Sequence, residues 1–187
     1  MQTIKEYFET EVQLFNRIPF DRVDAVVAQL ERARTEGRRI FVFGNGGSIT
    51  TAAHFACDLG KGVAEPGRPR FKVISIPDNL ATLTAYANDM GYVSIFAESL
   101  IALAQPGDIA FALTASGNSA NVVRAVEAAE KQGLQTIAFT GFDGGLVKER
   151  VELTVHVPAH SMPMVEDVHM ALTHAICEML KLQHEPH

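Results

Sequence analysis

The chain has 187 residues, of which 47% are hydrophobic and 20% are charged, and its formal net charge is -6. This length and composition predict one globular domain spanning residues 1–187, for which the alternation of strands and helices along the chain predicts the α/β class. The acidic balance argues against a nucleic-acid partner, and no apolar run approaches the roughly 20 residues that span a bilayer. The two cysteines, Cys57 and Cys177, match no metal or redox spacing, and the N-terminus lacks a signal-peptide pattern, so we expect reduced thiols in a cytoplasmic protein.

The N-terminal part differs in texture from the rest of the chain. Residues 3–36 carry two helical patterns separated by Pro19, which predict a helical hairpin. From Arg39 onward, short apolar runs end in Gly, Ser, Thr or Asp. Five such runs predict strands that are buried on both faces: RIFVFG, FKVIS, DIAFALT, QTIAFT and LTVHV.

Helical segments lie between and after these strands. They are expected at 50–59, 80–86, 93–104 and 120–131, near Leu146, and at 165–182. This alternation predicts a five-stranded parallel sheet flanked by helices in three layers. Ligands of such sheets lie beyond the carboxyl ends of the strands. Those ends carry the segments GNGGS, ASGNS and TGFDGG.

The first glycine-rich loop predicts a phosphate site. Asn45, Gly46, Gly47 and Ser48 follow a strand and precede a helix, so free amides and the helix dipole favour an anion. A tight turn that binds nothing is the alternative. A nucleotide cofactor is not indicated, because Ile49 stands where GxGxxG needs its third glycine and no Gly-Lys-Ser/Thr follows.

The second loop, residues 114–119, ends another strand and begins another helix. Asn118 or Ser119 could simply cap that helix. Two such loops on adjacent parallel strands could instead surround one phosphate with hydroxyls and amides, without a lysine. Ser116 and Ser119 then join Ser48 as candidate ligands.

Titratable residues form two further groups. His54 and Asp58 lie four residues apart on one helix face. Glu166 and His174 are eight residues apart, about two helical turns, so they also share roughly one face. Each group could be an ordinary local or core arrangement, or together they could supply a proton-transfer pair or four metal ligands. The pair Asn88-Asp89 interrupts a helical pattern. These residues could cap the next helix or could supply polar groups to a site.

The ordered set of GNGGS with HFA one turn later, AND, SGNSANVVRA, TGFDGG, VHVP and EDVHMALTHAI resembles the SIS (sugar isomerase) domain. Within it, the chain resembles the phosphoheptose isomerase (sedoheptulose-7-phosphate isomerase) family. The resemblance covers nearly the whole chain. It implies a flavodoxin-like fold and a homotetramer in which residues 1–36 take part in packing between subunits.

The resemblance also implies roles for single residues. Asn45, Gly46, Gly47, Ser48, Ser116, Asn118 and Ser119 match the phosphate loops, and Asn88-Asp89 match a polar pair beside the sugar. Asp58 stands where the family usually has a glutamate base, and His174 matches its catalytic partner. His54, Asp58, Glu166 and His174 match the zinc ligands of metal-bound members, one zinc per subunit, although glutamine is usual at the position of Glu166.

The implied activity is aldose-ketose isomerisation of a phosphosugar, typically sedoheptulose 7-phosphate to glycero-manno-heptose 7-phosphate. Two alternatives remain open from the sequence. One is a non-catalytic SIS module that binds a sugar phosphate or a replication initiator, and the other is an isomerase of a different phosphosugar. The retained histidines and carboxylate favour catalysis, because a binding module needs only the phosphate loops.

Overall fold

Five parallel strands form the centre of the protein, described here for residues 3–182 by a computed structural model. The order across the sheet is β2-β1-β3-β4-β5, which is the flavodoxin-like order. This arrangement confirms the α/β class and the five-stranded parallel sheet expected from the sequence. The strands are β1 (Arg39–Gly44), β2 (Lys72–Ser75), β3 (Ile109–Thr114), β4 (Gln135–Thr140) and β5 (Leu153–His156).

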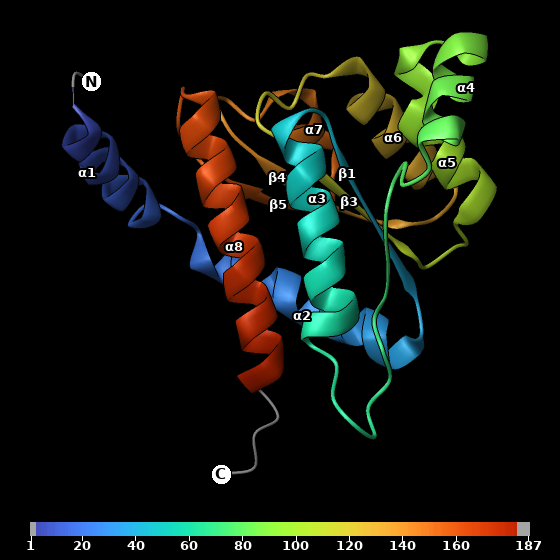
Figure 1. Ribbon diagram of the computed structural model, residues 1–187, viewed down its shortest axis with the longest axis horizontal. Helices are drawn as coiled ribbons and strands as arrows, with labels where there is room; N and C mark the ends of the chain where they lie inside the picture. Colours follow the sequence, from blue (N-terminus) through green and yellow to red (C-terminus); the bar gives the residue numbers. More distant parts are fainter. Residues whose placement is uncertain (1–2, 183–187) are drawn as a thin grey trace.

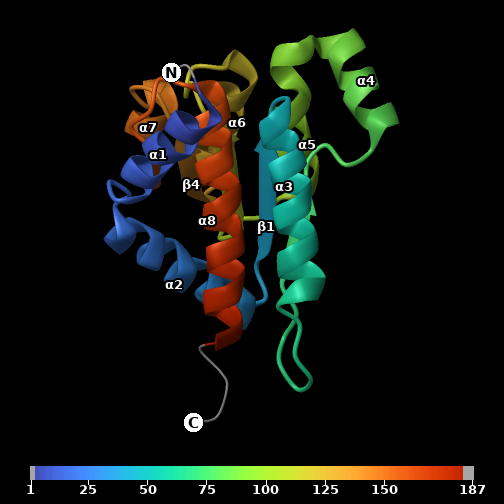
Figure 2. The same ribbon diagram turned by 60° about the vertical axis from the view of Figure 1, so that its left-hand side comes forward.

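Helices cover both faces of the sheet (Figure 1). The helices α2, α3 and α8 lie on one face, and α5, α6 and α7 lie on the other. Figure 2 shows α3 and α8 side by side in front of the sheet. The bounds are α1 (Ile4–Phe15), α2 (Phe20–Glu36), α3 (Gly47–Cys57), α4 (Leu80–Met90), α5 (Ile95–Leu103), α6 (Ala120–Lys131), α7 (Gly145–Arg150) and α8 (Met162–Leu182).

The strands are apolar throughout because both of their faces are covered. In β1, Ile40 and Val42 pack into the core under α2, α3 and α8, whereas Phe41 and Phe43 pack under α5 and α6. All four side chains are fully buried. This alternation is the reason why the strand sequences read as continuous hydrophobic runs.

Two parts of the structure differ from the sequence expectations. The helix α1 begins with a capping box between Thr3 and Glu6, but it packs against α8 and does not run alongside α2 (Figures 1 and 2), so the expected hairpin is not formed. The helix α4 continues through Asn88 and Asp89, which do not interrupt it.

The helix α3, which follows the first glycine-rich loop, changes its geometry at its C-terminal end. A π-helical turn, Asp58–Gly62, continues α3, so Asp58 lies at the junction of the two helical forms. None of the helices within residues 3–182 is long and apolar enough to cross a membrane. Cys57 and Cys177 are free thiols, the first exposed and the second buried.

Candidate active site

Two loops meet where the strand order of the sheet reverses. β1 lies between β2 and β3, and the helix after β1 covers one face of the sheet while the helix after β3 covers the other. The two connections therefore separate at the carboxyl ends of β1 and β3. This switch point is where sheets of this class bind their ligands.

The loop after β1 is built from glycine because backbones approach closely there. A Cβ on Gly44 would lie 2.4 Å from the carbonyl oxygen of Leu113 in β3. Gly46 has a φ of 56°, in the left-handed region that favours glycine. The loop then turns directly into α3, and the Ser48 side chain of the first helical turn is buried. This side chain lies against Gly44 of β1, where a Cβ would be 2.7 Å from the Cβ of Ser48.

The loop after β3 is equally constrained. Gly117 has a φ of 64°, and a Cβ there would lie 1.9 Å from the carbonyl oxygen of Gly144. The Gly117 amide donates a hydrogen bond to Oγ1 of Thr114 at 3.2 Å. Ser119 occupies the N-cap position of α6, but its hydroxyl makes no capping bond. That hydroxyl is therefore available to a ligand, in contrast to the simple capping role considered from the sequence.

A recess of about 80 Å³ lies between the two loops. The three serines predicted to bind phosphate all line it, and no lysine or arginine is among the lining residues. A ligand phosphate would be held by hydroxyls and by the amides of helix ends, not by a cation. The lining residues are Asn45, Ser48, Leu113, Thr114, Ala115, Ser116, Ser119, Met162 and Glu166.

The side-chain amide of Asn45 forms hydrogen bonds to other side chains of the protein. Its Nδ2 donates to Oδ1 of Asn121 at 2.9 Å, and Nδ2 of Asn121 donates to its Oδ1 at 2.8 Å. Tyr92 Oη donates to the same Oδ1 at 2.9 Å. Sequence reasoning missed Asn121 and Tyr92. The signal for Asn121 was its helical spacing from Ala125 and Ala128, which places it on the buried face of α6.

Asn118 has a similar bracing function in the second loop. Its Oδ1 accepts a hydrogen bond from the Leu146 amide at 3.1 Å, and its Nδ2 donates to the Ser116 carbonyl at 3.2 Å. The Asn118 side chain thereby joins the second loop to the start of α7. Both asparagines predicted as ligands thus shape the recess through these bonds.

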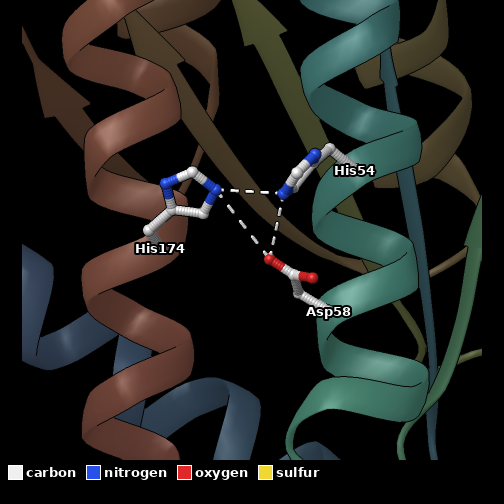
Figure 3. Close-up of side chains that lie close together, drawn as sticks. All are labelled: His54, Asp58 and His174. Atoms are coloured by element: carbon white, nitrogen blue, oxygen red, sulfur yellow. Dashed lines mark hydrogen bonds and ion pairs between the residues drawn. The ribbon is translucent and has the colours of Figure 1, made fainter.

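Two histidines and a carboxylate converge between α3 and α8 (Figure 3). Nε2 of His54 lies 3.2 Å from Oδ2 of Asp58 and 3.0 Å from Nε2 of His174. Nε2 of His174 lies 4.0 Å from the same Asp58 oxygen. The expected proximity of His54 and Asp58 on one helix face is confirmed. Their side chains and that of His174 are each one third to one half exposed, so small molecules can reach them.

These three residues also have the chemistry of a metal site. One ligand atom from each, two imidazole nitrogens and a carboxylate oxygen, lie within 4.8 Å of one another. Three such donors with an open position are the usual set of a catalytic zinc site. The donor set therefore fits zinc.

Glu166, the fourth expected metal ligand, lies apart from this cluster. Its carboxylate lines the recess between the two loops, close to Gly47 at the start of α3. Its participation in metal binding stays a prediction.

Asn88 and Asp89 lie in the last turn of α4 and are not among the residues that line the recess. Nδ2 of Asn88 donates to Oδ1 of Asp89 at 2.8 Å, and both side chains are exposed. No side chain of α4 is buried, and the helix stands out from the sheet in Figure 2. Their place beside a bound sugar stays a prediction.

One further histidine is buried beneath this layer. His169 of α8 is 1% exposed, and burial lowers its pKa to about 4. Its Nε2 lies 3.4 Å from the Thr140 carbonyl oxygen, while Nδ1 has no partner within residues 3–182. His169 is thus a neutral core residue and not part of the exposed cluster.

The sheet order and the loops at its switch point are those of a flavodoxin-like α/β domain. Residues 6–141 match the SIS domain family, to which the chain belongs. Within that class it belongs to the phosphoheptose isomerase family. It is 35% identical over 181 residues to the phosphoheptose isomerase of Thermodesulfovibrio yellowstonii, an alignment that covers 95% of this chain and 90% of the relative.

Solved structures agree with this assignment. A phosphoheptose isomerase from Francisella tularensis superposes with a TM-score of 0.89 and 28% identity, covering 96% of each chain. The phosphoheptose isomerase of Neisseria gonorrhoeae gives 0.88 and 26%, covering 96% of this chain and 97% of the other. The family resemblance stated from the sequence motifs is confirmed.

Proposed function

We propose that the protein is an aldose-ketose isomerase of a phosphosugar, most simply one that interconverts sedoheptulose 7-phosphate and glycero-manno-heptose 7-phosphate. The observation that carries the proposal is the pairing of the serine-lined recess with the His54, Asp58 and His174 cluster along α3. Ser48 and His54 are six residues apart, about 9 Å along the helix axis. A sugar whose phosphate lies in the recess would extend toward the cluster. The relatives named above carry the matching activity in their names.

The chemistry requires moving one proton between adjacent carbons. In the proposed mechanism, the Asp58 carboxylate removes the proton from the carbon next to the carbonyl, which gives an enediol. His174 donates a proton to the carbonyl oxygen as the enediol forms. The proton held by Asp58 is then delivered to the former carbonyl carbon, while the hydroxyl on the adjacent carbon returns a proton to His174 and becomes the new carbonyl. Because a positioned acid or base contributes about 10²- to 10⁴-fold to such steps, losing either residue should be severe.

Zinc is part of the proposal. His54, Asp58 and His174 would hold it, with Glu166 as the fourth ligand that the family resemblance implies. A bound zinc ion supplies polarisation of the sugar oxygens. His54→Ala should reduce zinc retained after dialysis, measured by elemental analysis, whether or not turnover changes.

The decisive experiment is turnover of sedoheptulose 7-phosphate by the purified protein, followed by NMR. We expect Asp58→Asn and His174→Ala to lower kcat/KM at least about 100-fold. The matched control is Glu178→Gln, one turn beyond His174 on α8, whose carboxylate pairs with exposed Lys181. No product above the Asp58→Asn background would refute the proposal, and in that case sugar-phosphate binding alone would favour a non-catalytic module.

The proposal includes a cytoplasmic homotetramer. Ile4, Phe8 and Val12 form one stripe on α1 at i, i+4 and i+8, and their exposed fractions are 79%, 59% and 56%. A second copy of the chain would cover this stripe, which supports packing through the N-terminal segment. Two free thiols suit a reducing compartment. Light scattering tests the assembly: a monomeric mass would contradict it.

A further inference from the structure

The carboxylate of Glu166 occupies part of the recess that the phosphate would enter. Its two oxygens lie 2.5 and 2.6 Å from the position that a Cβ on Gly47 would take. Gly47 is the first residue of α3, so the carboxylate sits against the amino end of that helix. The same carboxylate lines the recess together with Ser48, Ser116 and Ser119.

This carboxylate has no polar protein partner in the described structure. Within residues 3–182 it forms no hydrogen bond or ion pair, whereas the neighbouring Asp167 accepts a hydrogen bond from Tyr7 of α1. The first turn of α3 contains no acidic side chain of its own. Glu166 therefore supplies the negative charge that the positive end of the α3 dipole attracts.

A phosphate would need the same place. The first turn of α3 and the serine hydroxyls are the groups that would hold it, and no lysine or arginine lines the recess to offset a second negative charge. Two like charges a few ångströms apart repel strongly where solvent is partly excluded. A phosphate dianion must therefore displace the Glu166 carboxylate or bind against its charge.

We propose that in the metal-free protein Glu166 lowers the affinity of the recess for phosphate by competing with it for the amino end of α3, and so acts as a specificity-determining residue. The inference rests on the proposed function and deepens it. A weaker hold on the phosphate makes substrate recognition depend more on the sugar hydroxyls, which can donate hydrogen bonds to a carboxylate. Removing the charge while keeping the shape of the side chain should strengthen phosphate binding.

The test is calorimetric titration of inorganic phosphate into metal-free protein at pH 8. We expect Glu166→Gln to bind phosphate at least tenfold more tightly than the unmodified protein. The matched control is Asp167→Asn, which makes the same charge change one residue along α8 on a side chain that faces α1. Its affinity should stay within twofold, because its charge lies outside the recess.

A gain in affinity cannot arise from a damaged fold, and Glu166→Ala provides a second variant with the same expected direction. Equal or weaker phosphate binding by Glu166→Gln would overturn the inference, as would an equal gain in Asp167→Asn. The inhibition constant of phosphate against turnover separates this inference from the proposed function. If the unmodified protein isomerises the sugar but Glu166→Gln shows no lower inhibition constant, only the inference fails. If no variant binds phosphate and none turns over the sugar, both fail.

Discussion

The reciprocal amide pair between Asn45 and Asn121 joins the glycine-rich loop after β1 to α6, and truncating its two members should destabilise the protein unequally. Asn121→Ala removes the two hydrogen bonds of 2.8 and 2.9 Å. Since each such bond contributes about 1 kcal/mol net, the expected loss is about 2 kcal/mol of unfolding free energy. The Asn45 amide that remains is only partly buried and keeps its bond from Tyr92, so water can satisfy the rest.

Asn45→Ala should be more damaging than Asn121→Ala. It removes three hydrogen bonds and leaves the Asn121 amide, which is 3% exposed, without partners. A buried polar group left unsatisfied costs about 1–3 kcal/mol in addition to the lost bonds, so we expect a total of about 4 kcal/mol. The double variant should be no less stable than Asn45→Ala, because the orphaned amide is gone.

Urea unfolding followed by circular dichroism, at one fixed protein concentration, measures these free energies. The double variant loses the three bonds, about 2.5 kcal/mol, without an orphaned amide, so the double-mutant cycle should give a coupling energy of about 3.5 kcal/mol. Tyr92→Phe serves as a control that removes only the exposed bond, with an expected loss near 0.5 kcal/mol. Equal losses for the two single variants, or additive losses in the double variant, would refute the assignment of this pair as the brace of the loop.

Two further predictions concern a glycine and a buried histidine. Gly117→Ala should destabilise the protein by about 3 kcal/mol or more, because the new Cβ would meet the Gly144 carbonyl. Gly67 also has a positive φ but has open space around it, so Gly67→Ala should cost about 1 kcal/mol in the same urea assay. For His169, the pKa of about 4 in the folded protein lies below the ordinary value of 6.5. Between these two values the unfolded chain binds a proton that the folded chain does not, so the free energy of unfolding falls as the pH drops from 6.5 toward 4. Urea unfolding at pH 6.5 and pH 5 should show a loss of about 2 kcal/mol that is absent in His169→Gln; equal losses in both proteins would contradict this.

The sequence was sufficient to predict the sheet and the position of the loops. Strands such as β1 and β3 are buried on both faces, so their hydrophobic runs stand out, and the chain order of strands and helices leaves few arrangements. The serines could be placed in one recess because the carboxyl ends of adjacent parallel strands meet at the same edge. His54 and Asp58 could be paired because a four-residue spacing fixes both the face and the distance.

The parts that could not be predicted depend on distances along helices and on side-chain directions. Glu166 and His174 share a face of α8, but eight residues separate them by about 12 Å along the axis, so a common face does not bring both to one point. The sequence shows that Asn45 and Asn118 lie in the loops but not that their amides form hydrogen bonds to other parts of the protein. The helix α4 buries no side chain, so the hydrophobic pattern of its sequence gives little information about where the helix ends. The interruption expected at Asn88 and Asp89 was therefore wrong.

The two roles proposed for Asp58 use different atoms of its carboxylate. Oδ2 faces the Nε2 atoms of both His54 and His174, which is the arrangement that a shared metal ion would require. Within residues 3–182, Oδ1 makes no hydrogen bond or ion pair, so it is the oxygen that can accept a proton from the sugar. The family resemblance gives glutamate as the usual residue here, one methylene longer. With aspartate, the reacting carbon of the substrate must lie closer to α3 to meet Oδ1. The longer side chain of Asp58→Glu should therefore misplace the substrate.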